Sequence, residues 1–484
     1  MAKETKVGAL VRVWSAAAER QRLENLALAR RLIRRSIGHQ VLVDYRPGHV
    51  WYNYAEYPAE PLSIPDEADE RKFARYRELG IEVFKIHEEW NDAFEVYGAD
   101  KFSPNNRRAF RTLIDRVHAH GMKFLPYIST GYYDKRSRRF RSRWANYLNG
   151  KIKSLTGGYY DLAECSPRSP EWRAFLLGAV ERLMAEYPLD GLYNDVGYNS
   201  LAMYDPPDPQ LGQVNAFEES PQRDGAFEDL TQELYTIVKR HRGIYATHFG
   251  RYYRSYNNYF TPDPWPPRFQ CYDYTFAGEA VGSLDALLRK VRRQPPFVLY
   301  IPDWRYIEKQ QPGLDSRAVY AISIPYLQFP VLYDGRPITG KKYRGRKLKY
   351  APVATGELPW PDQIAGYYRE HPGAEPIYSP WEQPPGNPRY REDYFHYFPI
   401  YRKMTRPGTH VFTEVQDQDL LAGRFWRDLV LSAFVNEEFY LAAASYFHRE
   451  ETLVFKEVWE DAETGRRSRE WKISPWEIKI FRRP

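Results

Sequence analysis

Short apolar segments alternate with amphipathic segments from about residue 40 onward, and this alternation constrains the fold more than any other feature of the chain. The apolar segments are rich in Val, Ile, Tyr and Phe and have the length of buried parallel strands. They are Gln40–Tyr45, Ile81–His87, Met122–Ile128, Gly191–Asp195, Gly243–His248, Arg268–Thr275, Pro296–Ile301 and Ile322–Leu332. The amphipathic segments have helical spacing and are Asp66–Leu79, Asn105–His120, Pro170–Glu186, Gly225–Arg240 and Ser283–Arg293.

Eight strands that alternate with helices predict an α/β fold, a (β/α)₈ TIM barrel over residues 39–406. A doubly wound sheet is the alternative, but no Gly-rich phosphate-binding turn follows any early strand. Long segments rich in Pro and aromatic residues follow several strands, at Tyr133–Gly158, Tyr198–Asp224, Arg251–Pro267 and Tyr333–Arg389. Barrel enzymes build their active sites at these C-terminal strand ends, so we expect the functional site there.

The two flanks of the predicted barrel have different patterns. Residues 1–38 predict an N-terminal helical segment, with one basic helix over residues 14–37 whose narrow apolar stripe favours docking over binding an anionic surface. After Pro407 short strand candidates follow one another without long helices between them. They are His410–Val415, Ala422–Val435, Phe439–Phe447, Thr452–Glu460 and Trp471–Phe481. Residues 407–484 therefore predict a small C-terminal all-β domain of the β-sandwich type.

Composition excludes several classes of protein. The chain has 13 Trp, 40 Tyr and 25 Phe, so that 16% of its 484 residues are aromatic, which excludes a disordered chain. No run of about 18 apolar residues is present, so we expect no membrane span. Cys165 and Cys271 are too few for a disulfide framework. Arg12 interrupts the short apolar run of Met1–Val13, so we do not expect this segment to be a signal peptide. These features favour a cytoplasmic protein.

Ionisable residues lie beside aromatic residues at the ends of six predicted strands. The candidates are His87, Glu88, Glu89, Trp90, Tyr132, Tyr133, Tyr193, Asn194, Asp195, His248, Asp273, Glu279, Asp303, Trp304 and Asp334. Carboxylates in an aromatic pocket suit cleavage of a glycosidic bond, because one carboxylic acid protonates the leaving oxygen while a second carboxylate attacks the anomeric carbon or activates water. Aromatic rings supply an apolar platform for the sugar.

The segments Ser166–Leu177 (SPRSPEWRAFLL) and Tyr187–Asp195 (YPLDGLYND) carry a family resemblance. Together they resemble TIM-barrel glycoside hydrolases of the α-galactosidase-like clan and related predicted glycoside hydrolases, in which such a helix leads into a strand that ends in Asp. The resemblance implies that Asp195 is the nucleophile and that strand six supplies the acid/base. Asp273 and Glu279 both fit that role, and Glu279 is favoured because it follows Gly278 and would be lifted onto the loop. The implied reaction is a retaining hydrolysis of O-glycosyl bonds in an oligo- or polysaccharide.

The remaining candidates at the strand ends are predicted to bind substrate. Two of them leave an alternative open, because His248 fits a core histidine equally well and Asp334 with Gly335 fits a turn. We expect no metal or organic cofactor. His118 and His120 have the spacing of paired metal ligands, but their position at a helix end before strand three places them at the bottom of the barrel, away from the site.

Basic runs bear on the partner of the chain. Lys135–Arg143 and Lys341–Lys349 follow predicted strands three and eight, and the net charge is +7. We expect a carbohydrate substrate that is anionic if these runs line the site, and no membrane partner. No nucleic-acid-binding module accompanies the runs, which disfavours nucleic acid. The alternative function is a non-catalytic glycan-binding barrel, in which the carboxylates at positions 195, 273 and 279 do not converge on one pocket.

Overall fold

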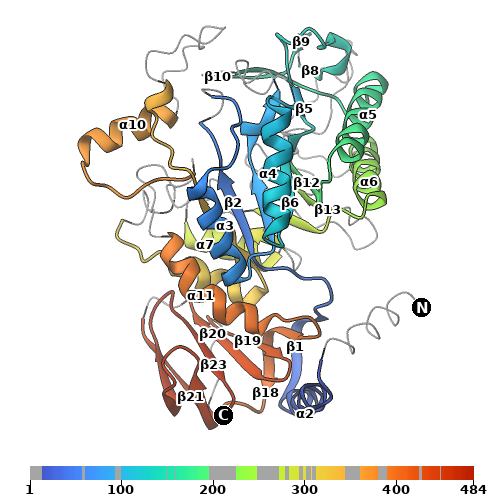
Figure 1. The fold of residues 1–484 in the computed structure, drawn as a ribbon. Coiled ribbons are helices and arrows are strands. Elements are labelled where there is room, and N and C mark those ends of the chain that lie inside the picture. Colours follow the sequence, from blue (N-terminus) through green and yellow to red (C-terminus); the bar gives the residue numbers. More distant parts are fainter. Residues whose placement is uncertain are drawn as a thin grey trace.

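The fold is taken from a computed structural model of the chain (Figure 1). The structure describes residues 14–56, 60–92, 100–148, 150–157, 160–195, 225–247, 272–277, 283–293, 298–300, 307, 312–343, 360–379, 390–423, 428–446 and 449–484. Among the predicted site residues, His248, Glu279, Asp303 and Trp304 lie outside these ranges.

The centre of the molecule is a nine-stranded sheet whose neighbouring strands all pair in parallel, in the order β16-β15-β14-β13-β12-β6-β3-β2-β17. The strands are β2 (His49–Asn53), β3 (Val83–Ile86), β6 (Lys123–Ser129), β12 (Gly191–Asp195), β13 (Ile244–Thr247), β14 (Tyr274–Ala277), β15 (Val298–Tyr300), β16 (Phe329–Pro330) and β17 (Leu332–Gly335). From β2 to β15 each strand pairs with the next strand of this set along the chain, as a βα repeat requires.

The two outermost strands of this sheet are consecutive in the chain. β16 pairs with β15 at one end of the sheet, and β17 pairs with β2 at the other end. Only Val331 separates β16 from β17. One short stretch of chain therefore reaches both ends of the sheet.

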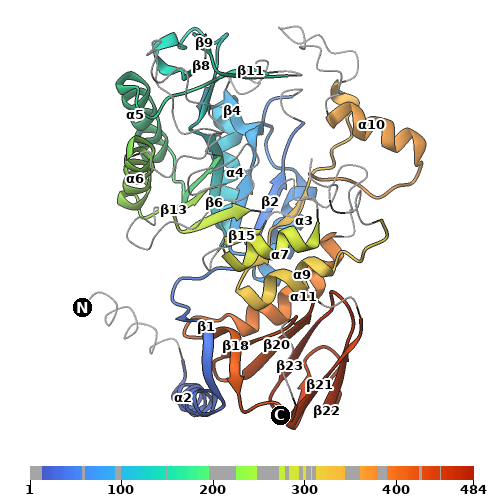
Figure 2. The same ribbon diagram turned by 180° about the vertical axis from the view of Figure 1, so that it is seen from behind.

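Helices cover the outer side of the sheet (Figures 1 and 2). They are α3 (Glu67–Leu79), α4 (Arg107–Ala119), α5 (Pro170–Glu186), α6 (Gly225–Arg240), α7 (Leu284–Arg293), α9 (Ala318–Ser323) and α11 (Tyr390–Met404), and α10 (Trp360–Glu370) stands apart from them. The limits of α3 follow from its sequence. Asp66 caps its N-terminus in a capping box with Asp69, and Gly80 ends it in the left-handed conformation.

A seven-stranded antiparallel sheet lies below the parallel sheet (Figure 2), in the order β1-β18-β19-β20-β23-β21-β22. Its strands are β1 (Ile33–Val41), β18 (His410–Gln418), β19 (Leu429–Val435), β20 (Phe439–Ser445), β21 (Glu451–Asp461), β22 (Arg467–Ile473) and β23 (Ile478–Arg482). Phe434 and Ile480 belong to the apolar core shared with the parallel sheet and its helices, whereas Leu431 and Trp459 belong to a second core with helix α2 (Ala16–Leu32). Both faces of β19 and β20, in the middle of the sheet, are thus buried.

Smaller strands lie in the segments that follow β3 and β6. β4 (Asn91–Asp92) pairs with β5 (Asp100–Pro104), and β8 (Tyr147–Leu148) pairs with β9 (Lys151–Ile152). A three-stranded antiparallel sheet has the order β10-β11-β7, with β7 at Tyr132–Asp134, β10 at Ser154–Gly157 and β11 at Tyr160–Glu164. The long segment after β6 is therefore folded, and Tyr132 and Tyr133 belong to one of its strands.

Several predictions of elements are confirmed and others are wrong. The helices Pro170–Glu186 and Gly225–Arg240 and the strand Gly191–Asp195 have the predicted limits. The predicted helix over residues 14–37 ends at Leu32, and Gln40 and Val41 belong to β1 of the antiparallel sheet, so that the first strand of the parallel sheet is β2. β1 (IRRSIGHQV) is mostly polar and β2 (HVWYN) is only five residues long, so apolar content alone did not locate either strand.

One further prediction fails towards the C-terminus. Residues 318–326, predicted in part as strand eight, form α9 and a 3₁₀ turn before β16 and β17. The described C-terminal strands belong to one hydrogen-bonded sheet, and Leu421, just after β18, also bridges to Phe455 of β21. The β-sandwich-like character of this domain remains a prediction. The domain limits 38/39 and 406/407 remain predictions, although β1 pairs with β18 across the first of them.

Gly191 at the start of β12 generates a prediction for stability. Its φ is +150°, and a Cβ there would lie 1.9 Å from the backbone oxygen of Ile244. We expect Gly191→Ala to cost about 3 kcal/mol or more in unfolding free energy, because β12 and β13 must separate to admit the methyl group. The control Gly178→Ala lies in α5, where the nearest atom is 3.4 Å away on a flexible Arg182 side chain, and should raise stability by about 0.5–1 kcal/mol. Thermal unfolding checks this prediction, and equal melting temperatures for Gly191→Ala and Gly178→Ala would contradict it.

Candidate active site

The strands of the parallel sheet direct alternate side chains to its inner and outer sides. On β12, Tyr193 contacts Phe276 of β14 and Trp51 of β2, which are not hydrogen-bonded neighbours of β12, so Tyr193 points to the enclosed side. Asn194 points the other way, where its amide donates to Tyr245 Oη at 2.7 Å and accepts from Thr130 Oγ1 at 3.0 Å. Asp195, the next residue, therefore shares the inner side with Tyr193.

Aromatic rings gather on the inner side of the sheet beneath the C-terminal strand ends. Trp51 stacks on His87 with ring centres 4.9 Å apart, and His87 lies 4.3 Å from the ring of Tyr127. Tyr127 in turn lies 5.7 Å from Tyr193. Trp51, Tyr127 and Tyr193 are buried, whereas His87 is partly exposed. His87 thus sits at the boundary between the packed interior and the open end of the strands.

Asp195 lies at the C-terminal end of β12 and is partly exposed. The hydroxyl of Tyr127, on the neighbouring strand β6, donates a hydrogen bond to Asp195 Oδ2 at 2.9 Å. A donor from a packed aromatic side chain fixes the orientation of the carboxylate and stabilises its charge. The carboxylate of Asp195 is therefore oriented, partly exposed and next to the aromatic rings of the inner side.

Lys85 of β3 also points to the inner side. Its Nζ lies 3.6 Å from the ring centre of Phe276 and 5.6 Å from that of Tyr193, and the residue is only 1% exposed. Burial lowers the pKa of the Lys85 amine well below its ordinary value. Below it in the same interior, His49 is buried and its Nε2 donates to Arg46 O at 2.7 Å.

Glu88 and Glu89 follow β3 in a 3₁₀ turn (Glu88–Trp90) and are both buried. Glu89 Oε1 accepts from the backbone N of Tyr54 at 2.9 Å. Burial outweighs the backbone hydrogen bonds and raises the pKa of Glu89 to about 8, with the nearby Glu88 adding to the rise. Glu89 is therefore an uncharged group near the site at neutral pH, and its bond to Tyr54 gives it a role in holding β2 against β3.

Three predicted substrate contacts belong to the core instead. Trp90 is fully buried, stacks on Phe110 of α4 at 4.8 Å and donates to Tyr127 O at 2.8 Å. Tyr133 is enclosed by Trp144 and Trp172. Asn194 faces outward, as described above. Each of these residues lies close to a strand end, but its side chain lies on the outer or packed side of its element.

Asp273 and Asp334 are also displaced from the predicted site. Asp273 precedes β14, at the end of the sheet opposite Asp195, and its Oδ2 accepts from Lys239 Nζ at 2.8 Å and from Tyr245 N at 2.9 Å. This position corrects its assignment as an alternative acid/base, because β14 starts later than predicted. Asp334 turns outward to α3, where Tyr76 Oη donates to it at 2.6 Å and Lys72 pairs with it. It anchors a helix and does not reach the inner side.

The basic run that follows β6 is largely paired within the chain. Lys135 pairs with Asp161 at 2.6 Å, Arg136 pairs with Asp134, and Arg143 pairs with Glu171 at 3.0 Å. Arg138, Arg139 and Arg141 are exposed. In the second run, Lys342 pairs with Glu60, and residues 344–349 lie outside the described ranges. The pairing reduces the positive charge that these runs present to a ligand.

His118 and His120 each have a carboxylate partner. His118 Nε2 lies 2.6 Å from Asp190 Oδ2, and His120 Nε2 lies 2.9 Å from Glu70 Oε2. Within the described ranges, no group of three or more His, Cys, Asp and Glu side chains is arranged to hold a metal ion. None of the described helices has the length and hydropathy of a membrane span.

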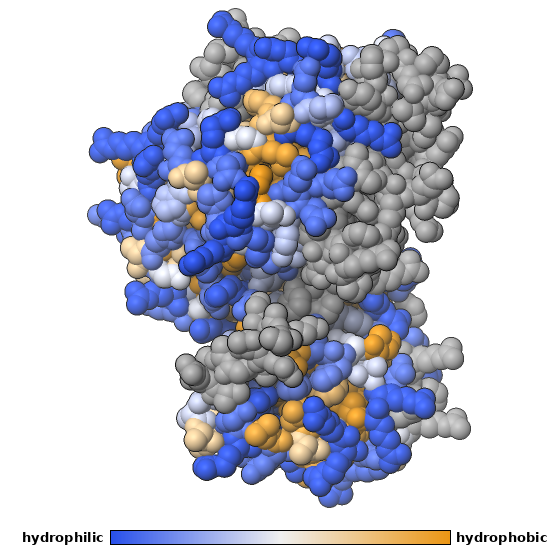
Figure 3. All heavy atoms as spheres, turned by 90° about the vertical axis from the view of Figure 1, so that its right-hand side faces the viewer, coloured by the Kyte–Doolittle hydropathy of each residue, from blue (hydrophilic) through white to orange (hydrophobic). Residues whose placement is uncertain are grey.

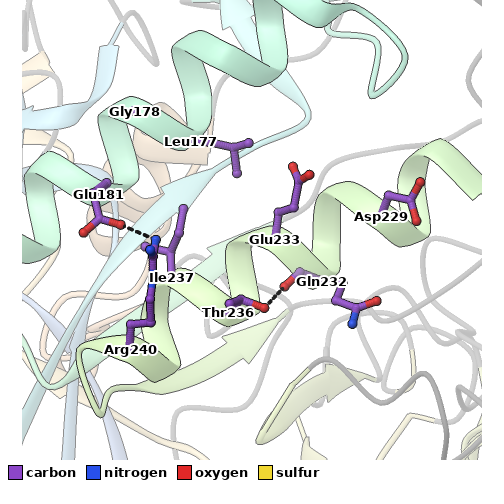
Figure 4. A pocket seen from close by; sticks show the side chains of 9 residues that line it. All are labelled: Leu177, Gly178, Glu181, Asp229, Gln232, Glu233, Thr236, Ile237 and Arg240. Atoms are coloured by element: carbon purple, nitrogen blue, oxygen red, sulfur yellow. Dashed lines mark hydrogen bonds and ion pairs between the residues drawn. The ribbon is translucent and has the colours of Figure 1, made fainter.

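A groove between α5 and α6, away from the strand ends, has a volume of about 720 Å³ (Figure 4). Leu177 and Ile237 contribute apolar walls, and an ion pair of 2.7 Å between Arg240 and Glu181 bridges the helices. Figure 3, which views the molecule from the side of these helices, shows apolar side chains among hydrophilic ones on this face. Its position on the outer helices separates this groove from Asp195.

Sequence reasoning missed Trp51, Lys85 and Tyr127. Trp51 lies on β2, which was not predicted as a strand, and the other two lie inside predicted strands instead of at their ends. A signal was present for both of these, because Lys85 interrupts an otherwise apolar strand and Tyr127 precedes the strand end by two residues. Because side chains alternate between the two sides of a strand, Lys85 would have been placed on the same side as His87, two residues later.

No family model matches the chain, and a search of curated proteins finds no match. Solved structures do match. A noncanonic maltogenic α-amylase, AmyB from Thermotoga neapolitana, aligns over 90% of this chain and 98% of its own, with 12% identity and a TM-score of 0.50. The trehalulose synthase MutB from Pseudomonas mesoacidophila MX-45 aligns over 90% of this chain and 99% of its own, with 11% identity and a TM-score of 0.51.

An α-galactosidase, AgaA from Geobacillus stearothermophilus, aligns over 90% of this chain and 55% of its own at 10% identity, with a TM-score of 0.49. The fold assignment depends on the first two structures. At these identities the likeness concerns the fold, which is that of the TIM-barrel glycoside hydrolases.

Glu89 generates a prediction for the pH dependence of stability. Its pKa is about 8 in the folded protein against an ordinary value of 4.5, so the unfolded chain loses its proton first and stability falls as pH rises from about 4.5 to about 8. Glu89→Gln keeps the acceptor for Tyr54 N but does not titrate. We expect the variant to gain on the order of 3 kcal/mol over wild type between about pH 4.5 and pH 7. Denaturant unfolding of both proteins at several pH values checks this prediction. The same dependence of unfolding free energy on pH in wild type and Glu89→Gln would contradict it.

Proposed function

We propose that the chain is a glycoside hydrolase that cleaves O-glycosyl bonds in an oligo- or polysaccharide by a retaining mechanism, with Asp195 as the nucleophile. The observation that carries the proposal is the carboxylate of Asp195 at the C-terminal end of β12, oriented by Tyr127 at 2.9 Å above a floor of inward-facing aromatic rings. Active sites of barrel enzymes lie at this end of the strands. The glycoside-hydrolase-like fold agrees with the proposal.

In the proposed reaction, Asp195 attacks the anomeric carbon and forms a covalent glycosyl–enzyme intermediate, which water then hydrolyses. The hydrogen bond from Tyr127 to Oδ2 holds the carboxylate in one orientation. Tyr127 is thus a positioning residue for the nucleophile. His87 and Trp51 lie beside it and supply the ring surface on which a sugar can stack.

The acid/base in this proposal is Glu279, which follows the sixth strand of the parallel sheet, β14, and lies outside the described ranges. β14 ends at Ala277, so Glu279 comes directly after the same end of the sheet as Asp195. A retaining mechanism requires the two carboxyl groups to lie about 5–5.5 Å apart. His248 follows β13 in the sequence and Asp303 and Trp304 follow β15, and these three residues complete the proposed substrate-binding set with His87 and Tyr193.

The proposal includes a complete barrel. β16 and β17 pair with β15 and β2 and are separated by Val331 alone, which supports treating residues 329–335 as one eighth strand that closes the sheet. Closure places the inward side chains of all strands around one axis. The contacts of Trp51 with Tyr193 and Phe276, across non-neighbouring strands, agree with such an enclosed interior.

The alternative function is a glycan-binding barrel without catalysis, for which the carboxylates at positions 195, 273 and 279 do not converge on one pocket. Asp273 lies at the opposite end of the sheet from Asp195, so the catalytic proposal depends on the pair Asp195 and Glu279. The packed aromatic residues would serve either function. Nucleic acid is disfavoured as a partner, because much of the described basic run after β6 is paired with carboxylates of the chain itself.

Asp195→Asn tests the proposal. We expect a loss of about a thousandfold or more in kcat on a panel of aryl glycosides and oligosaccharides, because an amide cannot attack the anomeric carbon. The matched control is Asp190→Asn, just before the opposite end of the same strand. Asp190 accepts from His118 and Lys123, so this variant should unfold at a lower temperature while its folded fraction keeps its activity. Equal turnover by wild type and Asp195→Asn would reject Asp195 as nucleophile, and glycan binding without turnover would favour the alternative.

Tyr127→Phe tests the positioning role. Removing a hydrogen bond to a charged group costs about 1.5–3 kcal/mol, so we expect kcat to fall about tenfold to a hundredfold while KM changes less. The ring remains, so the stacking with His87 should persist and the variant should fold as wild type does. A change confined to KM would show that Tyr127 contacts the substrate instead.

A further inference from the structure

Lys85 is a buried basic side chain for which the proposed reaction has no use. Within the part of the chain that the structure describes, its Nζ has no hydrogen-bond partner. In that same part the amine lies against the rings of Phe276 at 3.6 Å and Tyr193 at 5.6 Å. Charged lysines are almost never fully buried without a partner, because an unpaired charge in an apolar interior is costly. Such a residue in a candidate site indicates a ligand.

The position of Lys85 links it to the candidate site. Lys85 lies two residues before His87 on the same inward side, and it is paired in register with Trp51 of β2 and Leu125 of β6. Its side chain crosses the interior to reach Phe276 of β14. The amine therefore lies one layer of side chains beneath the group formed by His87, Tyr127 and Asp195.

The surroundings of Lys85 supply few charges. Among the described residues, the titratable side chains that face the same interior are His49, His87, Tyr127, Tyr193, Tyr274, Asp195 and Tyr333. His49 is a second basic group, and its Nδ1 also has no partner in the described ranges. Asp195 is bonded to Tyr127 and is the only carboxylate of this set. The described interior therefore favours a ligand with negative charge.

We infer that Lys85 recognises the carboxylate of an acidic sugar, and that the substrate of the proposed hydrolase is a uronic-acid-containing glycan. The inference rests on the proposed function, since it assigns the substrate class of the same site. A single amine matches the single charge of a uronate, and an ammonium–carboxylate pair in a dry site is a strong interaction. The flexible four-carbon stem of lysine lets the amine rise towards a sugar that stacks on His87 and Trp51.

Recognition of a carboxylate has a measurable proton signature. Burial lowers the pKa of the free Lys85 amine, and a bound carboxylate would favour its charged form. The amine then takes up a proton when the uronate binds, at pH values between the pKa of the free amine and the higher pKa of the bound amine. A neutral sugar in the same site produces no such uptake.

Isothermal titration calorimetry with D-glucuronate and D-glucose on the wild-type protein tests the inference. Neither monosaccharide has a bond to hydrolyse, so binding is read without turnover. We expect glucuronate to bind at least about tenfold more tightly than glucose, and titrations in buffers of different ionisation enthalpy to reveal proton uptake. Lys85→Met should lose both effects. Lys123→Met, which removes a strand lysine paired with Asp190 at 3.0 Å at the other end of the sheet, should keep both.

Three outcomes would overturn the inference. They are equal affinity for the two sugars, zero proton uptake across the pH range, and absence of glucuronate binding to wild type. Each is measured on wild type, so the result does not depend on how Lys85→Met folds. The inference and the proposed function can fail separately. Selective uronate binding by a protein without glycosidase activity would reject the hydrolase alone, whereas turnover of neutral glycans without uronate preference would reject the role of Lys85 alone.

Discussion

Alternation of side chains along the parallel strands is the constraint on which the rest of the structure depends. On β12 it sends Tyr193 and Asp195 to the inner side and Asn194 to the outer side, where Tyr245 and Thr130 hold it. A shift of one residue would bury the carboxylate of Asp195 against the helices and place an amide in the interior. Gly191, with its φ of +150° and close approach to Ile244, fixes where this strand starts and hence which side each residue faces.

The antiparallel sheet packs against one end of the parallel sheet and its helices. Its β19 and β20 are buried along their whole length, because one face packs under the parallel sheet and its helices and the other belongs to a core shared with α2. The ion pair of Arg292 with Glu414 at 2.6 Å joins helix α7 to β18 of the antiparallel sheet. The candidate site lies at the end of the parallel strands that is far from the antiparallel sheet.

Much of the fold could be predicted from the sequence, because strands and helices with strong periodicity have clear limits, as Pro170–Glu186 and Gly191–Asp195 do. The first strand of the parallel sheet could not be predicted, because β2 has only five residues and the residues predicted in its place belong in part to β1, a mostly polar strand that pairs with the distant β18. For the site, proximity to a strand end selected Asp195 and His87, which lie on the inner side, together with Trp90, Asp334 and Asp273, which face the core, a helix and the opposite end. Side-chain direction, more than position in the chain, decides which residues meet, and it depends on strand limits that are accurate to one residue.

The pairing of β1 with β18 has a consequence for how the chain is made. Ile33 lies opposite Gln418 and Val41 opposite His410, so this ladder joins residues separated by more than three-quarters of the chain. A ribosome must release nearly all of the sequence before the ladder can form, and until then the apolar side of α2 stays uncovered. The emerging N-terminal segment therefore depends on its own charged residues, or on a chaperone, to remain free of aggregation while the parallel sheet folds ahead of it.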